Sequence, residues 1–235
     1  MDLNSGMYIN GEYLKNNPTW DDEDAAWKAG QIHQLLRRNK VQPVQITEIG
    51  CGAGGILENL GSLLPQVMDL RGYDISPQAI EIAQRRQTER LKFFRDDFLS
   101  ANETAECVLM IDVVEHVADY YGFMEKLKSK GKIFVFHIPL DASCHSLLKP
   151  QTMKQQRDAV GHLHYFSEEM VWWFLKDTKF EVIDWMYTKP IPDIEKKSRS
   201  FKQAIKKRLR NLSFAINPSK SVKLWGGYSL MILAK

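Results

Sequence analysis

The stretch Gln45-Ile-Thr-Glu-Ile-Gly-Cys-Gly-Ala-Gly-Gly55 joins a short apolar run to a row of glycines. The run at 44–49 is typical of a buried strand, and the segment at 55–64 is typical of a helix. Glycine lets the backbone turn sharply and lets a ligand approach the helix N-terminus closely. The stretch therefore predicts a strand, a ligand-binding turn and a helix, the opening unit of an α/β fold.

The same alternation of short apolar runs and longer amphipathic segments extends outward from this unit. Further strands are expected at 68–73, 90–94, 107–112 and 132–138, and helices at 21–40, 77–88 and 114–129. Such alternation indicates a parallel sheet. After residue 165 we expect a helix at 168–176 and an antiparallel pair of strands at 179–187 and 224–233. The predicted fold is a doubly wound, Rossmann-like α/β domain with a seven-stranded, mostly parallel sheet and an antiparallel C-terminal hairpin.

Length and composition favour one large globular domain over residues 1–235. The chain has 235 residues, of which 44% are hydrophobic and 26% charged. It lacks a signal-peptide pattern and any apolar run of about 18 residues, so we expect a cytoplasmic protein. Cys51, Cys107 and Cys144 are odd in number and widely spaced, which argues against disulfides and structural zinc. Within the domain we expect an N-terminal lid and helix at 1–40 and a cofactor-binding core at 44–140.

Charge is distributed unevenly along the chain. From Lys189 onward there are 12 Lys and Arg against 2 Asp and Glu, a formal charge of +10. The other 20 basic and 27 acidic residues give −7, so the net charge of +3 conceals a basic C-terminal part. Positive charge concentrated in one segment is informative about the binding partners of a protein, and less so about its fold.

The glycine turn alone is compatible with two cofactors. Gly50, Gly52 and Gly55 also satisfy the dinucleotide fingerprint of NAD-binding proteins. Glu48 discriminates, because a carboxylate two positions before the first glycine would repel a pyrophosphate. The same carboxylate suits a ligand that carries an ammonium and a sulfonium group, as S-adenosylmethionine does.

Acidic residues follow the next three predicted strands, at the rim where open α/β sheets bind ligands. Asp74 is placed to accept ribose hydroxyls. Asp97 and Phe98 can supply a carboxylate for an adenine amino group and a ring for its face. Asp112 ends the fourth strand, where it lines the pocket or caps the following helix. Phe98 is equally compatible with ordinary core packing.

These motifs, in this order, resemble those of class I S-adenosylmethionine-dependent methyltransferases. The resemblance covers roughly residues 44–140 and rests on Glu48-x-Gly-x-Gly-x-Gly54, Tyr73-Asp-Ile-Ser76, Asp96-Asp-Phe98 and Asp112-Val-Val-Glu-His-Val117. It implies that S-adenosylmethionine is the cofactor. It also implies that this cofactor is held by Glu48, Gly50, Cys51, Gly52, Gly54, Asp74, Ile75, Asp97, Phe98, Asp112, Val113 and Val114.

The acceptor side offers histidines as candidate catalytic bases. His137 follows the fifth strand and His164 follows the next connection, so both can border an acceptor cavity and remove a proton from a hydroxyl. His116, after Glu115, lies in a run that resembles ubiquinone-pathway O-methyltransferases, where these positions can hold a divalent ion. Asp112 replaces the first glutamate of that pattern, and we expect no metal.

The predicted function is therefore methyl transfer to a small-molecule acceptor, at oxygen in preference to nitrogen, for example on a sugar or lipid-linked intermediate. Two alternatives stay open at this stage: a NAD-dependent oxidoreductase and a non-catalytic S-adenosylmethionine-binding protein. Tyr13, Trp20 and Trp27 can close over the pocket as part of an N-terminal lid, or pack as ordinary core.

A basic segment precedes the last predicted strand, within an insertion expected at 193–217. Lysines and arginines over 195–212 alternate with Phe201, Ile205, Leu209 and Leu212 at spacings of three or four, which predicts a basic amphipathic helix. Its apolar stripe either docks on the domain or meets an anionic acceptor or membrane surface. Nucleic acid is disfavoured, because aromatic residues are not interleaved with the basic ones.

Overall fold

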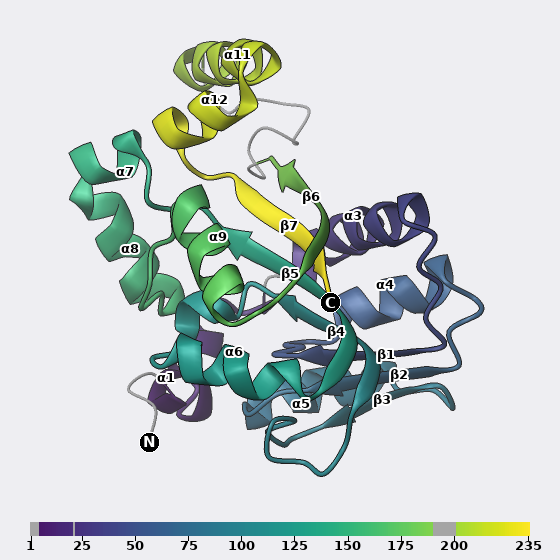
Figure 1. The fold of residues 1–235 in the computed structure, drawn as a ribbon. Coiled ribbons are helices and arrows are strands. Elements are labelled where there is room, and N and C mark those ends of the chain that lie inside the picture. Colours follow the sequence, from purple (N-terminus) through teal and green to yellow (C-terminus); the bar gives the residue numbers. More distant parts are fainter. Residues whose placement is uncertain (1–4, 21, 190–200) are drawn as a thin grey trace.

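A seven-stranded sheet forms the centre of the computed structural model, which describes residues 5–20, 22–189 and 201–235 (Figure 1). The strand order is β3-β2-β1-β4-β5-β7-β6. In chain order the strands are β1 (Gln45–Ile49), β2 (Asp69–Tyr73), β3 (Leu91–Phe94), β4 (Ala105–Ile111), β5 (Gly131–Pro139), β6 (Val182–Thr188) and β7 (Ser229–Ala234). The first five are parallel, and β7 runs antiparallel between β5 and β6. The predicted doubly wound fold with its antiparallel C-terminal hairpin is confirmed.

Helices cover both faces of this sheet. On one face the core includes side chains of α3 (Ala25–Arg38), α4 (Gly55–Leu63) and α5 (Pro77–Ala83). On the other it includes side chains of α6 (Tyr120–Lys128) and α9 (Glu168–Asp177). The strand period of two divides the sheet residues accordingly: Cys107 and Leu109 of β4 belong to the first core, and Val108 and Met110 to the second.

Several predicted boundaries are wrong, and local capping explains them. α6 begins only at Tyr120, because the Asp119 side chain accepts a hydrogen bond from the Gly122 amide and starts the helix there. The predicted last strand begins five residues too early, because Asn217 caps a helix, α12 (Pro218–Trp225), that occupies its expected start. The connection after β5, expected as a loop, contains α7 (Cys144–Leu148) and α8 (Pro150–Val160).

Two short helices, α1 (Ser5–Ile9) and α2 (Glu12–Asn16), precede α3 and lie against the end of α8. The Tyr8 hydroxyl donates to the carbonyl of Val160 at 2.9 Å. The Asn17 side chain donates to the carbonyl of Ala159 at 3.0 Å. The N-terminal segment is thereby tied to the connection that follows β5.

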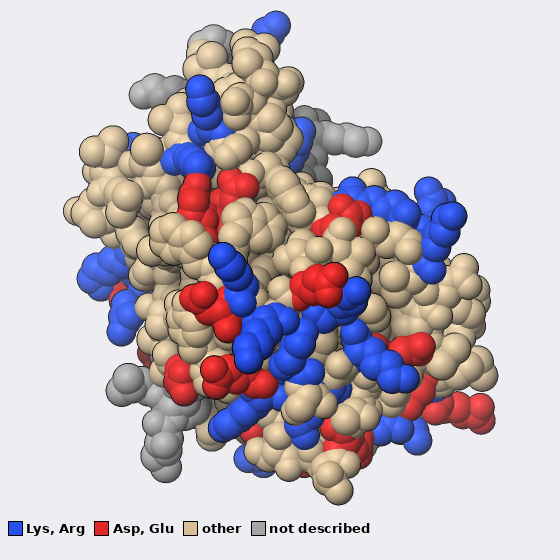
Figure 2. Space-filling model, in the orientation of Figure 1, with Lys and Arg blue, Asp and Glu red and all other residues tan. Residues whose placement is uncertain are grey.

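The basic segment contains α11 (Phe201–Ile216), which with α12 projects beyond the end of the sheet (Figure 1). The predicted basic residues Lys196, Lys197 and Arg199 lie outside the described residues. Over α11, the uppermost part of the face in Figure 2 shows Lys and Arg without Asp or Glu. Among the residues that the structure describes, none of the helices has the length and apolar character needed to cross a bilayer.

Candidate functional site

The glycine turn after β1 borders a pocket of about 930 Å³. Gly50 and Gly54 have φ values of +69° and +81°, a region that disfavours other residues. A Cβ on Gly54 would lie 2.4 Å from the Phe93 ring, and one on Gly50 would lie 2.7 Å from Val113. Close packing as well as backbone conformation therefore requires glycine at both positions.

Glu48 lies beneath this turn, lines the pocket and is 1% exposed. Its Oε2 atom has no hydrogen-bond partner among the described residues. Burial raises the pKa of this carboxyl, Lys28 opposes the shift, and Asp74 adds to it. A buried carboxyl oxygen without a partner at the pocket wall is suited to a cationic ligand group.

Asp74 holds the turn in place from the end of β2. Its carboxylate accepts hydrogen bonds from the Gly52 amide at 3.0 Å and the Ser76 amide at 2.8 Å. Burial raises the pKa of Asp74, and these backbone bonds lower it. Asp74 and its neighbour Ile75 both line the pocket, and their contact with a cofactor stays a prediction.

Asp97 and Phe98 also border the pocket, but most of their contacts are local. The carboxylate of Asp97 accepts from the Leu99 amide at 3.0 Å and the Ser100 hydroxyl at 2.8 Å, so it caps its own turn. Phe98 is fully buried, with its ring 5.0 Å from that of Tyr73. The structure thus supports the core interpretation of Phe98 alongside a pocket contact.

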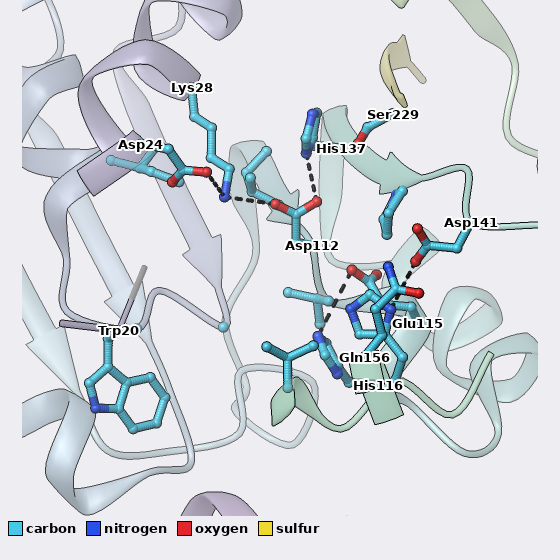
Figure 3. Close-up of a pocket in the computed structure, with 18 of the residues that line it drawn as sticks. Trp20, Asp24, Lys28, Asp112, Glu115, His116, His137, Asp141, Gln156 and Ser229 are labelled. Atoms are coloured by element: carbon cyan, nitrogen blue, oxygen red, sulfur yellow. Dashed lines mark hydrogen bonds and ion pairs between the residues drawn. The ribbon is translucent and has the colours of Figure 1, made fainter. Parts of the chain in front are cut away.

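Asp112 connects three elements at the centre of the pocket (Figure 3). Its carboxylate lies 2.8 Å from Lys28 Nζ and 2.6 Å from His137 Nδ1, and Lys28 also pairs with Asp24 at 2.9 Å. Burial opposes the ionisation of Asp112, but the nearby His137 and Lys28 lower its pKa. Asp112 therefore forms an ion-pair network and is not the helix cap considered from the sequence. Lys28 and Asp24 were not predicted as site residues, because the sequence of a helix does not indicate which cavity or element each of its faces packs against.

The three predicted catalytic histidines differ in position. His137 lines the pocket, with Nε2 2.8 Å from the Thr188 hydroxyl. His164 does not line it: its Nε2 bonds the carbonyls of Val117 and Ala118, so it holds loop backbone, and the prediction of a base there needs correction. Val114, predicted beside the cofactor, likewise does not line the pocket, because it is fully buried in the core that includes side chains of α6 and α9.

His116 lines the pocket within a cluster that also contains Glu115 and His162. One ligand atom from each lies within 4.8 Å of the others. The outer nitrogens of both rings are hydrogen-bonded, Nδ1 of His116 to the Tyr8 hydroxyl at 2.9 Å and Nδ1 of His162 to Asp141 at 3.0 Å. These bonds orient both Nε2 atoms, as outer-sphere partners do in metal sites.

The electrostatics of this cluster fit a divalent cation. Both carboxyl oxygens of Glu115 are buried without a hydrogen-bond partner in the described part of the chain. Burial and the charge of Asp112 raise the pKa of Glu115. Burial and His162 lower the pKa of His116 to about 4, which keeps its imidazole neutral and able to coordinate. The expectation of no metal took no account of His162, which a distant segment brings to the cluster.

Cations gather at the opposite end of the pocket from the glycine turn. Lys206 and Arg210 of α11 and Lys189 after β6 line it. Lys206 Nζ lies 3.4 Å from His145 Nε2, and burial together with the charges of Lys206, Lys149 and Arg210 lowers the pKa of His145. Arg210 is buried, with its guanidinium 6.0 Å from the Tyr228 ring centre. The basic segment therefore contributes side chains to the pocket itself.

The aromatic N-terminal segment completes the pocket wall. Tyr8, Tyr13, Trp20 and Trp27 all line it. The Tyr13 and Trp20 rings lie 4.5 Å apart, and a Cβ on Gly52 would lie 3.9 Å from Trp20. Trp20 therefore lies over the glycine turn, whereas Tyr8 lies beside His116 and Trp27 beside His137.

Comparison with known proteins gives two kinds of match. A family model described as "Methyltransferase domain" matches residues 22–184. The chain is also similar to the ubiquinone biosynthesis O-methyltransferase of Mesorhizobium japonicum, at 35% identity over 89 residues, which is 35% of this chain and 34% of that protein. The chain thus aligns with about a third of the length of this curated relative.

Solved structures match over most of the chain. The putative methyltransferase of Haloferax volcanii, in complex with the Trm112 methyltransferase activator, has a TM-score of 0.66 and 14% identity, covering 100% of this chain and 97% of that one. The magnesium protoporphyrin IX methyltransferase of Synechocystis PCC 6803, with bound SAH, has a TM-score of 0.58 and 15% identity, covering 89% and 81%. At these identities the likeness concerns the fold. Because the family model matches more than half of the chain, the chain belongs to the methyltransferase domain family and has the class I S-adenosylmethionine-dependent methyltransferase fold.

Proposed function

We propose that this chain transfers the methyl group of S-adenosylmethionine to an oxygen atom of an anionic small molecule. One observation carries the proposal: a continuous pocket joins carboxylates at the glycine turn to cations beneath α11. Glu48, Asp74 and Asp112 suit the ammonium and sulfonium groups of the cofactor, whereas Lys206 and Arg210 suit an acceptor of negative charge. Sugar phosphates and lipid-linked sugar intermediates combine such a charge with a hydroxyl.

His137 is the best-placed proton acceptor of the three predicted histidines. Asp112 holds its Nδ1 at 2.6 Å, which fixes the tautomer and leaves Nε2 to accept a proton on the pocket side. The Thr188 hydroxyl is hydrogen-bonded to that nitrogen at 2.8 Å. The hydroxyl of an acceptor can share this hydrogen bond or take the place of Thr188 in it. General base catalysis of this kind contributes roughly 100-fold or more to turnover.

Glu115, His116 and His162 would hold a divalent cation at the side of the same pocket. When bound, such a cation supplies positive charge that makes an acceptor hydroxyl more acidic. Titration of chelator-treated protein with Mn²⁺ or Zn²⁺ by calorimetry tests this part. Glu115→Gln should abolish binding, Asp141→Asn should weaken it by about 10- to 100-fold, and His164→Gln should leave it unchanged. Equal affinities for all variants would rule the cluster out.

The activity itself is tested by methyl transfer from labelled S-adenosylmethionine to matched pairs of hydroxyl compounds, one anionic and one neutral. We expect label on the anionic member. His137→Gln should lower turnover without changing cofactor affinity, and His33→Gln, a partly exposed residue of α3 that does not line the pocket, serves as its control. If the chain binds the cofactor but no acceptor becomes labelled, the result favours the alternative of a non-catalytic S-adenosylmethionine-binding protein. Equal labelling of neutral compounds would reject the anionic class.

The oxidoreductase alternative finds little support in the pocket. The buried carboxyl of Glu48 lies against the glycine turn where a dinucleotide would place its pyrophosphate. Repulsion between two anionic groups at such a site is costly. Calorimetry with NAD and with S-adenosylhomocysteine compares the two cofactors directly, and tight NAD binding alone would reverse the assignment.

A further inference from the structure

The helix α11 has its apolar stripe on the solvent side. Ile205, Leu209, Leu212 and Ile216 follow one another at spacings of four, three and four, which places them on one helical face. They are 46%, 49%, 58% and 76% exposed, respectively. The first possibility considered from the sequence, a stripe docked on the domain with cations facing water, does not describe this arrangement.

The opposite face of α11 holds the helix to the domain. The Phe214 ring stacks on Tyr228 with 5.1 Å between ring centres, and the Trp225 indole donates to the Ser213 hydroxyl at 2.9 Å. Arg210 and Lys206 point from this side into the pocket. One helix thus presents cations inward to the pocket and aliphatic side chains outward.

The charged side chains of α11 and α12 themselves are all basic. α11 and α12 together contain seven Lys and Arg residues and no Asp or Glu. One of the seven, Lys223, pairs with Glu169 of α9. Arg208 is exposed beside the stripe. An aliphatic stripe flanked by basic residues is the pattern of helices that lie in the surface of an anionic bilayer.

Exposed leucines also occur on α7, which lies next to this region. Leu147 and Leu148 are 65% and 83% exposed, and His145 of the same helix contacts Lys206 of α11. Two elements that line the basic end of the pocket therefore both carry aliphatic side chains in solvent. An aliphatic surface lacks the aromatic rings on which nucleic acid bases stack.

We propose that the outward face of α11, made of Ile205, Leu209, Leu212 and Ile216, docks on an anionic phospholipid surface. A helix lying on the bilayer would bring Lys206 and Arg210 close to the headgroup layer, from which an anionic, lipid-linked acceptor enters the pocket. The nature of that acceptor rests on the proposed function. The docking itself depends only on the exposed stripe and the charge beside it.

The test is co-sedimentation of the full chain with vesicles of phosphatidylcholine alone or mixed with phosphatidylglycerol, at low and high salt. Wild type should bind the mixed vesicles at low salt and lose binding as salt rises. Leu209→Gln with Leu212→Gln should weaken binding by roughly tenfold or more. Arg208→Gln should weaken it about fivefold at low salt. The matched control is Leu63→Gln with Met68→Gln, which replaces exposed apolar residues at the far side of the sheet and should bind as wild type.

Three outcomes would overturn the docking proposal. Wild type that binds mixed and neutral vesicles equally, or a folded stripe variant that binds as wild type, shows that α11 does not meet the bilayer. A dimer in sedimentation velocity that the stripe variant abolishes, without vesicle binding, assigns the stripe to a second copy instead. Because vesicle binding needs neither cofactor nor acceptor, its failure is distinguishable from a failure to methylate water-soluble anionic compounds.

Discussion

The two ends of the pocket carry opposite charge. At the glycine turn, Glu48, Asp74 and Asp112 line the pocket, and Lys28 pairs with Asp112 and Asp24. Beneath α11, Lys206 and Arg210 lie beside a neutral His145. A sulfonium cofactor and an anionic acceptor would each meet the complementary end, which favours the orientation needed for transfer.

The uneven distribution of charge along the chain also produces the charge difference between the two ends of the pocket. The +10 charge from residue 189 onward would be a solvated surface feature if α11 only faced water. The antiparallel hairpin returns this segment to the C-terminal end of β5, where three of its cations, Lys189, Lys206 and Arg210, line the pocket. The asymmetry between the parts of the chain thus becomes an asymmetry between the ends of one cavity.

Asp112→Asn gives the largest expected effect, because it breaks the network at the centre of the acidic end. Among the described residues Lys28 would keep Asp24 as its one ion-pair partner, and the free energy of unfolding should fall by about 3 kcal/mol, as for a mostly buried ion pair. Since the pKa of Asp112 is lowered in the folded state, wild type should lose this advantage as pH falls below about 4. Urea unfolding at several pH values measures both.

The matched control for this network is Asp184→Asn, which breaks the more exposed pair with Arg38 on the outer strand β6. Surface pairs contribute at most about 1 kcal/mol. Equal losses in the two variants would contradict the view that the acidic end is organised by a buried ion pair.

Glu48→Gln tests the match between the acidic end and a cationic cofactor. Loss of one charge-assisted contact should weaken S-adenosylmethionine binding by about 10- to 150-fold, or roughly 1.5–3 kcal/mol, with folding intact. Glu89→Gln, an exposed change of the same charge, should have no effect.

Glu48 also predicts a pH dependence of cofactor binding. Burial raises its pKa, so the carboxyl is partly neutral at low pH, and a bound ammonium group favours its ionised form. Binding should therefore release a proton, and affinity should rise with pH until Glu48 is ionised in the free protein. Calorimetry in buffers of different ionisation enthalpy measures the released proton. If the affinity of wild type for the cofactor depends on pH in the same way as that of Glu48→Gln, the ionisation of Glu48 is not coupled to cofactor binding.

Arg210→Gln and Arg208→Gln separate the inner and outer faces of α11 and have the smallest expected effects. Arg210→Gln should raise the KM for an anionic acceptor by roughly tenfold, the size of one charge-assisted hydrogen bond, with little change in cofactor affinity. Arg208→Gln, exposed on the same helix, should leave the KM for a water-soluble acceptor unchanged. Similar KM values in both variants would mean that the basic end does not contact the acceptor.

The sequence by itself determined the sheet, its direction and the acidic end of the pocket. Those features depend on local signals: glycines with positive φ after β1, period-two apolar residues in the strands, and carboxylates at consecutive strand ends. Parallel strands bring their C-terminal ends to one edge of the sheet. The strand assignment alone therefore predicts that Glu48, Asp74 and Asp112 lie at the same edge.

Only the tertiary structure decided which side chains from distant segments join that edge. Lys28 reaches Asp112 from α3, and His162 reaches Glu115 and His116 from the connection after α8. Lys206 and Arg210 reach the pocket because α11 turns its polar side inward. Helical periodicity fixes which residues share a face, but the direction of that face depends on packing between elements, which no local pattern encodes.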